Sequence, residues 1–153
     1  STPIKHDNTL ASLLVDADAF IGVSAANLVN KEMVKSMHKD PIIFAMANPT
    51  PEISYIEAKQ AGGYIVGSGR SDYPNQINNV LAFPGIFKGA LAIRASKINE
   101  EMKLAASKAI AYVIKDEELS PDYIVPSPFN PRVVKEVSEA VKKAAIDTKV
   151  NKI

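Results

Sequence analysis

The sequence predicts an α/β fold in which short parallel strands are covered by helices. Apolar runs that are too short for helices alternate with segments whose apolar residues recur every three or four positions, which is the helical spacing. The clearest run, Pro41–Ala47, is apolar throughout, which is typical of a strand buried on both faces of a parallel sheet. A chain of 153 residues is long enough to bury a core of its own.

Helices and strands are predicted to alternate in the first half of the chain. The expected elements are, in order, a short helix capped by Asn8 or Thr9, a strand over Ala19–Val23, a helix capped by Asn30, a strand over Pro41–Ala47, a helix over Glu52–Gln60 and a strand over Tyr64–Val66. Pro49 and Pro51 end the second strand, because proline lacks the N–H that a strand donates. Gly62 and Gly63 are expected to end the helix before the third strand.

Only helices are predicted after the third strand. The expected elements are a helix from about Val80 with Pro84 in its first turn, a helix capped by Asn99, an irregular segment marked by Pro121, Pro126 and Pro128, and a last helix capped by Asn130 with Pro131 as its first residue. Three strands make a thin sheet for so many helices. We therefore expect part of a doubly wound, Rossmann-like parallel sheet with extra C-terminal helices, and we interpret residues 1–153 as the carboxyl-terminal part of a larger α/β enzyme.

The charge and composition of the chain exclude several classes of function. The net charge is +1, from 18 basic and 17 acidic residues, and no basic stripe with interleaved aromatics occurs, so nucleic acid is not an expected partner. No apolar run approaches the roughly 18–20 residues of a membrane span, and the first residues lack the apolar stretch of a signal peptide. The chain has no cysteine, which excludes disulfides and thiol chemistry and fits a cytoplasmic protein.

Glycine and polar residues follow each predicted strand. These segments are Gly22-Val23-Ser24, Asn48-Pro49-Thr50 and Gly67–Arg70. Because ligands bind at the carboxyl ends of strands in open α/β sheets, we expect a ligand at this edge. The stretch Gly67–Gly85 is the most informative, since it places an Arg, an Asp and four carboxamides between an apolar strand and an apolar helix. A folding core does not require these side chains, which points to a small polar ligand.

The phosphate-binding turn of a dinucleotide domain does not occur in this sequence. Such a turn reads G-x-G-x-x-G and joins the first strand of the domain to the helix that follows it. Gly67-Ser68-Gly69 supplies only the first two glycines, and it comes after two strand–helix units. We therefore reject this segment as a phosphate cradle.

Three runs of residues resemble the carboxyl-terminal half of malic enzyme, in its compact microbial form. They are A-D-A-F-I-G-V-S (Ala17–Ser24), I-F-A-M-A-N-P-T-P-E (Ile43–Glu52) and G-R-S-D-Y-P-N-Q-I-N-N-V-L-A-F-P-G (Gly69–Gly85). The resemblance extends from Ala17 to about Asp147 and so covers most of the chain. N-P-T followed by N-N-x-x-x-F-P-G, in this order and spacing, is a specific signature.

The resemblance implies an oxidoreductase. Malic enzymes oxidise malate with NAD or NADP and decarboxylate the product with the help of Mg²⁺ or Mn²⁺, which yields pyruvate and CO₂. By this resemblance the substrate-binding residues are Asn48, Asn78 and Asn79, and the cofactor-binding residues are Gly22, Val23, Ser24 and Asn48. Carboxamides suit the task, because each can donate to a carboxylate or accept from a hydroxyl without adding a charge. A glycine at position 22 would let the backbone approach the cofactor closely.

The other catalytic groups of the family do not map onto this chain. The general-base lysine, the tyrosine acid, the metal-binding carboxylates and the glycine-rich turn all lie upstream of the matched segment in the family. No residue here is therefore assigned to catalysis or to a metal ion, and we expect the isolated chain to be inactive on malate. We expect the parent enzyme to be a homo-oligomer. The residue that reads the ribose also lies upstream, so the choice between NAD and NADP stays open.

Simpler interpretations of the same residues stay open as well. Asn48 can be a turn former before proline, and Asn78 with Asn79 can cap a helix. Arg70 and Asp72 are expected to form a surface ion pair. For the whole chain, the alternatives are part of another amino- or hydroxy-acid dehydrogenase, or a non-catalytic Rossmann-like domain that dimerises or binds a partner. The last alternative predicts a large exposed apolar patch.

Overall fold

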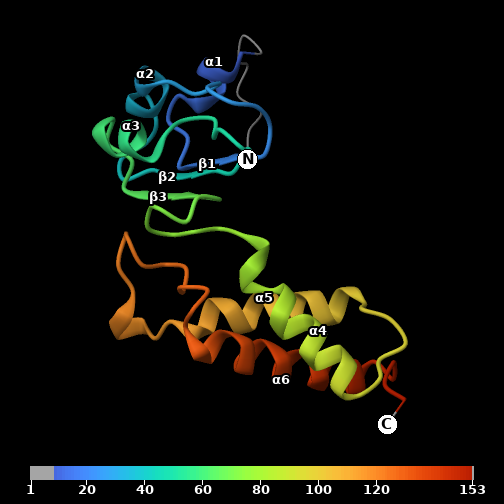
Figure 1. The fold of residues 1–153 in the computed structure, drawn as a ribbon. Coiled ribbons are helices and arrows are strands. Elements are labelled where there is room, and N and C mark those ends of the chain that lie inside the picture. The colour runs from blue at the N-terminus through green and yellow to red at the C-terminus, as the bar shows by residue number, and fades with distance from the viewer. Residues whose placement is uncertain (1–8, 153) are drawn as a thin grey trace. The chain divides into compact units, whose positions relative to one another are not determined.

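A computed structural model describes residues 9–152 of the chain. The chain divides into two compact units, residues 1–77 and residues 78–153. Among the described residues, the first unit contains the strands and the second contains helices and their connections (Figure 1). Each unit has a hydrophobic core of its own.

The first unit is built on three parallel strands. Its elements are α1 (Leu10–Leu14), β1 (Ala19–Gly22), α2 (Lys31–Lys35), β2 (Ile42–Ala45), α3 (Tyr55–Gln60) and β3 (Ile65–Ser68). The strands lie in the order β1-β2-β3, and their register places Ile21 beside Phe44 and Phe44 beside Gly67. The predicted α/β class and the predicted order of helices and strands are confirmed.

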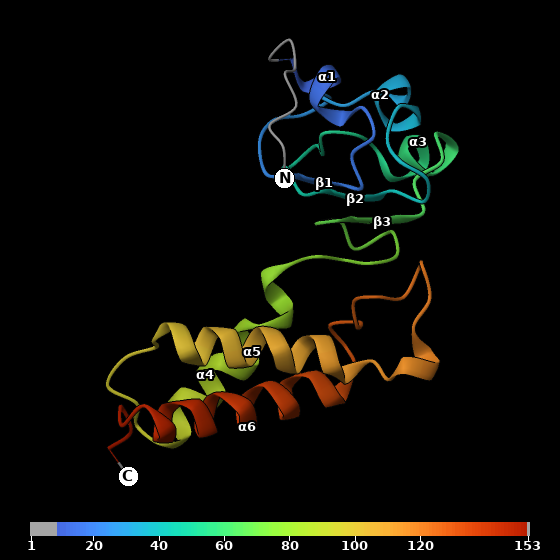
Figure 2. The same cartoon turned by 180° about the vertical axis from the view of Figure 1, so that it is seen from behind.

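One face of this sheet carries the core of the first unit. The helices α1, α2 and α3 lie on this side of the sheet in both views (Figure 1, Figure 2). The buried apolar side chains are Leu14, Val29, Val34, Met37, Ile43, Ala45, Ile53, Ala58, Ala61 and Val66. Burial of a side chain of the size of Ile43 stabilises the fold by roughly 1.5–3 kcal/mol.

The opposite face of the sheet is only partly covered. Ile21 in β1 is 66% exposed, while Phe44 in β2 and Ile65 in β3 are half-buried. The apolar strands were predicted to be covered by helices on both faces. In the described residues this prediction is wrong for β1, whose outer face is exposed at Ile21. The reason is that the three helices of the first unit all pack on the same side of the sheet.

Several predicted boundaries shift by a few residues, while the predicted caps hold. β1 ends at Gly22 instead of Val23, β2 is shorter at both ends than the predicted Pro41–Ala47, and the helix expected from about Val80 begins at Phe83. α3 begins at Tyr55 instead of Glu52, because Ser54 Oγ accepts the N–H of Glu57 over 3.2 Å and caps the helix there. β3 extends to Ser68, because the end of this strand continues to pair with β2. The confirmed caps are Thr9, Asn30, Asn99 and Asn130. Asn8, the alternative to Thr9, lies outside the described residues.

The second unit is a bundle of three helices. Its elements are the 3₁₀ helix η1 (Asn79–Leu81), α4 (Phe83–Ala92), α5 (Glu100–Val113), the 3₁₀ helix η2 (Asp116–Glu118) and α6 (Pro131–Asp147). α6 packs along both α4 and α5. The buried core consists of Leu81, Ile86, Ala90, Met102, Ala106, Val113, Val133, Val137, Val141, Ala145 and Val150. From the end of β3 to residue 152, the prediction of helices as the only regular elements is confirmed.

Two glycines allow α4 to approach α6 closely. A Cβ atom on Gly85 would lie 2.5 Å from the Cβ of Val137, and one on Gly89 would lie 2.6 Å from the carbonyl oxygen of Ser138. A Cβ atom does not come this close to a non-bonded carbon or oxygen atom unless the helices shift, so only glycine fits at this helix spacing. Pro84 lies in the first turn of α4, as predicted.

The outer side of α4 is exposed and apolar. Phe83, Phe87 and Leu91 recur every four residues along it, and Leu91 is 75% exposed. The rings of Phe83 and Phe87 lie 6.0 Å apart between centroids. A partner-binding domain was expected to expose such a patch, but part of a larger enzyme would expose one as well. The patch therefore does not separate these two interpretations.

Candidate functional site at the carboxyl ends of the strands

The turn after β1 holds three of the residues predicted to bind the cofactor. Gly22 is buried, Val23 is 77% exposed and Ser24 is also exposed. The N–H of Ser24 donates to Oε1 of Glu52 over 2.8 Å, and its Oγ donates to the same oxygen over 3.2 Å. The shape of this turn is therefore held by a carboxylate from the segment that follows β2.

Glu52 is a buried acid whose place in the site the sequence analysis missed. It is 0% exposed, and its Oε2 accepts the N–H of Ala47 over 3.1 Å. Burial alone would raise the pKa of the Glu52 carboxyl, but the hydrogen bonds from Ser24 and Ala47 outweigh burial and lower the pKa. The side chain is therefore ionised at neutral pH. The available signal was an acid between two apolar residues, Pro51 and Ile53.

Gly22 makes room for this carboxylate. A Cβ atom on Gly22 would lie 2.5 Å from Cδ and 2.6 Å from Oε1 of Glu52. This contact accounts for the glycine within the first unit itself. The role of Gly22 in cofactor binding stays a prediction.

Asn48 follows β2 and lies against the turn after β3. It is exposed, and its peptide bond to Pro49 is cis. Its Nδ2 is 3.6 Å from the position that a Cβ atom on Gly69 would take, which is ordinary van der Waals contact. Because the three strands are parallel, their carboxyl ends meet at one edge of the sheet. At this edge the structure brings together the predicted residues of the first unit, Gly22, Val23, Ser24 and Asn48.

The loop after β3 is held by its own side chains. Asn75 is buried and donates from Nδ2 to the carbonyl oxygen of Val66 over 3.1 Å. Arg70 donates to Asp72 from Nε over 2.8 Å and from Nη2 over 2.7 Å, which confirms the predicted ion pair. This pairing lowers the pKa of the Asp72 carboxyl. One of the four carboxamides in the loop is thus explained by folding alone.

Asn78 and Asn79 lie in the second unit, at the start of η1. Oδ1 of Asn78 accepts the N–H of Val80 over 3.0 Å, which confirms that Asn78 caps this helix. Both asparagines are exposed. Because Asn48 belongs to the first unit, the meeting of the three asparagines around one substrate stays a prediction.

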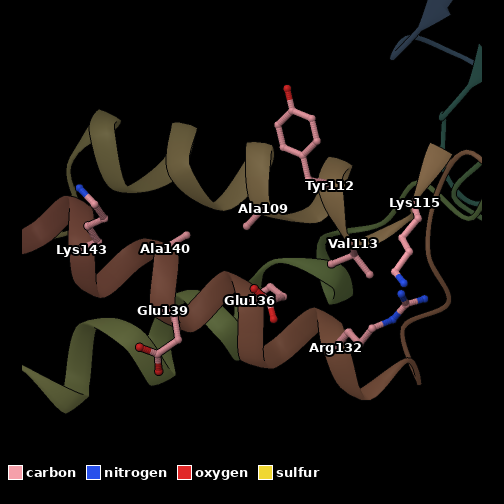
Figure 3. Close-up of a pocket in the computed structure, with 9 residues that line it drawn as sticks. All are labelled: Ala109, Tyr112, Val113, Lys115, Arg132, Glu136, Glu139, Ala140 and Lys143. Atoms are coloured by element: carbon pink, nitrogen blue, oxygen red, sulfur yellow. The ribbon is translucent and has the colours of Figure 1, made fainter.

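A groove on the second unit involves none of the predicted site residues. It encloses about 500 Å³ between α5 and α6, and Figure 3 shows Tyr112 projecting away from the helices beside it. The lining residues are Ala109, Tyr112, Val113, Lys115, Arg132, Glu136, Glu139, Ala140 and Lys143. Its floor of small residues and its mixed charges do not favour one class of ligand.

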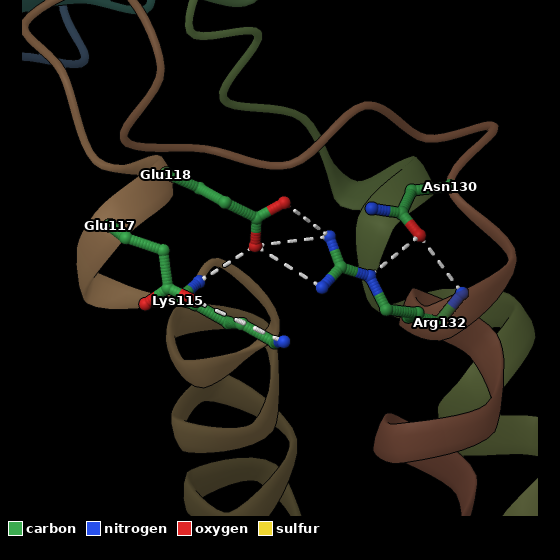
Figure 4. Close-up of polar contacts among 5 residues, drawn as sticks. All are labelled: Lys115, Glu117, Glu118, Asn130 and Arg132. Atoms are coloured by element: carbon green, nitrogen blue, oxygen red, sulfur yellow. Dashed lines mark hydrogen bonds and ion pairs between the residues drawn. The ribbon is translucent and has the colours of Figure 1, made fainter.

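The Arg132 guanidinium at one end of this groove is already paired. Figure 4 shows Glu118 of η2 facing Arg132 of α6, with Oε1 accepting from Nη2 over 3.0 Å. Glu118 also accepts the N–H of Lys115 over 3.0 Å, and Asn130 caps α6 by accepting the N–H of Arg132 over 3.0 Å. The bond with Arg132 lowers the pKa of the Glu118 carboxyl. A guanidinium held in this way supports the connection between α5 and α6, and we assign no ligand to it.

The described residues form neither a cluster of metal-binding side chains nor a helix that could span a membrane. Residues 9–152 contain no group of three or more His, Asp or Glu side chains that could hold a metal ion. None of the helices described is long and apolar enough to cross a membrane. His38 lies at the surface with Nδ1 3.6 Å from Asp18, and His6 lies outside the described residues.

Sequence comparison with known proteins points to a single protein family. The sequence model of the family described as "Malic enzyme, NAD binding domain" matches residues 63–149. The bifunctional malic/malolactic enzyme of Bacillus subtilis is 60% identical over 149 residues, which is 97% of this chain and 36% of that protein. The NAD-dependent malic enzyme of Geobacillus stearothermophilus is 54% identical over 150 residues, which is 98% of this chain and 31% of that protein.

The fold agrees with that of a solved malic enzyme. The crystal structure of Entamoeba histolytica malic enzyme superposes with a TM-score of 0.89 at 42% identity, and covers 95% of this chain and 30% of that one. The chain thus spans about a third of the length of these relatives. The curated malic enzymes similar to it include both NAD- and NADP-dependent enzymes.

Proposed function

The chain belongs to the malic enzyme family, and from this premise we propose that it is the carboxyl-terminal portion of the NAD(P)-binding domain of such an enzyme. The parent enzyme oxidises malate with NAD or NADP and releases pyruvate and CO₂. The observation that carries the proposal is the match of residues 63–149 to the NAD-binding domain of this family. It is supported by the exposed polar edge at the ends of β1 and β2.

The side chains at this edge suit substrate and cofactor. The exposed carboxamide of Asn48 can donate to a malate carboxylate or accept from the malate hydroxyl, and Asn78 and Asn79 offer the same chemistry from the second unit. Gly22-Val23-Ser24 forms the cofactor-facing turn, in which exposed Val23 offers an apolar surface to a planar ring. Because none of these side chains is ionised, they orient malate without competing with a cation for its carboxylates.

NAD or NADP supplies the hydride acceptor in the parent enzyme, and a divalent ion, Mg²⁺ or Mn²⁺, assists decarboxylation. The residues of this chain contribute binding and orientation, and the proton-transfer groups and metal ligands are assigned to other parts of the parent enzyme. Its small-molecule partners are malate and pyruvate. We expect it to bind neither nucleic acid nor a membrane. We place the parent enzyme in the cytoplasm as a homo-oligomer.

A chimera with the Bacillus subtilis relative tests this function. The matching 149-residue segment of that protein is replaced by this chain, and malate-dependent reduction of NAD and of NADP is measured with Mg²⁺ or Mn²⁺. We expect the chimera to be active and the 153-residue chain alone to be inactive. Asn48→Ala or Asn78→Ala should lower kcat/KM for malate by about 10- to 100-fold, since a hydrogen bond to a charged group contributes about 1.5–3 kcal/mol.

Asn30→Ala is the matched control, because Asn30 caps α2 through the N–H of Met33 over 3.0 Å, as Asn78 caps η1. We expect this variant to lower the melting temperature and to leave kcat/KM unchanged. If Asn78→Ala behaves in the same way, the cap is its whole role. An inactive chimera that is folded, or turnover of malate by the chain alone, would contradict the proposed function.

A further inference from the structure

Glu52 joins two turns that come from different strands. Its Oε1 accepts from the N–H and the Oγ of Ser24 in the turn after β1, and its Oε2 accepts from the N–H of Ala47 at the end of β2. Ala47 immediately precedes Asn48 in the sequence. One side chain therefore contacts both the turn predicted to face the cofactor and the residue next to the predicted substrate ligand.

We propose that Glu52 is a positioning residue that locks the turn after β1 to the turn after β2, and so fixes the distance between Ser24 and Asn48. The inference rests on the proposed function, in which these two residues face cofactor and substrate. Glu52 itself is 0% exposed, so its side chain presents no surface to a ligand. Its effect on the reaction passes through the two residues that it holds.

The chemistry of the side chain explains why an acid is needed here. A carboxylate only accepts hydrogen bonds, and it has two oxygens with which to do so. The groups that hydrogen-bond to it are all donors: the backbone N–H groups of Ser24, Ala47 and Glu52 itself, and the hydroxyl of Ser24. Hydrogen bonds to an ionised acceptor are stronger than those between neutral groups, so the two turns are held firmly. A glutamine would place an NH₂ against one of the donors and could serve only one turn.

Main-chain bonds hold the same segment independently of the carboxylate. The N–H of Val29 donates to the carbonyl oxygen of Glu52 over 3.0 Å, and the N–H of Asn27 donates to that of Pro51 over 3.0 Å. These bonds remain when the side chain is changed. We therefore expect Glu52→Gln, which keeps the size of the side chain, to fold and to loosen only the two turns.

The test compares Glu52→Gln with Glu57→Gln. Glu57 is exposed, in α3, and loses the same charge by the same change five positions away. Hydrogen exchange of the Ser24 and Ala47 amides is measured in the 153-residue chain, and KM and kcat for malate and for the cofactor are measured in the chimera. For Glu52→Gln we expect faster exchange at these amides and a fall of about tenfold or more in kcat/KM, because displaced binding groups lower the rate steeply. Glu57→Gln should change neither.

The outcomes separate the inference from the proposed function. An inactive wild-type chimera contradicts the proposed function. Amide exchange in the 153-residue chain still tests whether Glu52 holds the two turns together. An active chimera in which Glu52→Gln and Glu57→Gln give the same kcat/KM per folded molecule overturns the inference and leaves the function standing. Glu52→Asp, which keeps the charge but is one methylene shorter, is the second variant, and it should restore exchange protection at one turn at most. If both Glu52 variants fail to fold, the role of Glu52 is structural and the inference is wrong.

Discussion

Each unit of this chain has a glycine that lies so close to another side chain that a Cβ atom would not fit, but the two neighbouring side chains differ in chemistry. In the first unit a Cβ atom on Gly22 would strike Glu52 at 2.5 Å, and in the second a Cβ atom on Gly85 would strike Val137 at 2.5 Å. The space beside Gly22 is filled by an ionised carboxylate, and the space beside Gly85 by an aliphatic side chain. The first contact lies among the hydrogen-bonded turns at the edge of the sheet, and the second lies in the apolar contact between α4 and α6.

The difference shows that close packing around a glycine does not by itself mark a functional site. Burying Val137 is favourable because it removes apolar surface from water. Burying Glu52 is unfavourable unless its hydrogen bonds offset the lost hydration of the charge. The chemistry of the group that fills the space therefore decides the interpretation. Among the described residues, the fully buried carboxylate, Glu52, belongs to the first unit, whereas the polar side chain buried in the second unit is the neutral hydroxyl of Ser138.

The largest effect is expected in the second unit, from Gly89→Ala. The added Cβ would lie 2.6 Å from the carbonyl oxygen of Ser138, and a backbone atom cannot move away without moving α6. We expect the free energy of unfolding of the second unit to fall by about 1–3 kcal/mol, which is typical of overpacking. This loss should appear although alanine favours a helix over glycine by about 1 kcal/mol.

Urea denaturation together with hydrogen exchange of each unit measures this effect. Leu91→Ala on the same helix is the control, because this side chain is exposed and should change little. Amides of residues 9–77 should keep their protection in Gly89→Ala if the two units have separate cores. An increase in stability would show that the helix pair can relax and that the close approach is not required.

An intermediate effect is expected in the first unit, from a double-mutant cycle of Gly22→Ala and Glu52→Ala. If the glycine is needed because of the carboxylate, Gly22→Ala should be costly in the wild type and nearly neutral beside Glu52→Ala. We expect a coupling free energy of about 1 kcal/mol, in the range found for residues in contact. Thermal unfolding of the four proteins measures it. Equal costs in both backgrounds would mean that the ring of Phe20, 2.8 Å from the added Cβ, restricts the glycine instead.

Sequence patterns predicted most of the fold because the signals were local. Asn30, Asn99 and Asn130 each precede a helical pattern, and each proves to cap its helix. The exposed face of β1 was not predicted, because an apolar run such as Ala19–Val23 does not record which neighbours cover it. The start of α3 was placed too early for a similar reason, since the backbone at Glu52 is held by contacts with residues far away in the sequence.

The candidate site was predictable only in part. The resemblance identified Asn48 and Asn78 by their motifs, but it said nothing of Glu52, whose partners Ser24 and Ala47 are found only in three dimensions. Asn75 shows the opposite error, since composition alone counted it with the polar ligand groups of its loop. Its side chain is buried and donates to the main chain of β3. Composition cannot tell a carboxamide that holds a loop from one that binds a ligand.

The smallest effect is expected at the Glu118–Arg132 pair of the second unit. The hydrogen bond from Arg132 lowers the pKa of Glu118 in the folded chain below its ordinary value, which applies only to the unfolded chain. A lowered pKa means that the contribution to stability is complete above that ordinary value and is lost as the pH falls through the folded value. Glu118→Gln should therefore be slightly less stable than the wild type at pH 7, and the two should converge at acidic pH.

Stability of the second unit, followed by amide exchange between pH 7 and pH 3, measures this convergence. The pair is partly exposed, so the difference at pH 7 should shrink in high salt, whereas the acid sensitivity caused by the buried Glu52 in the first unit should depend much less on salt. A pH titration at low and at high salt therefore distinguishes the partly exposed Glu118–Arg132 pair from the buried Glu52 carboxylate. If the Glu118→Gln difference persists unchanged at pH 3, the pair acts through packing of the η2 turn and not through its charge.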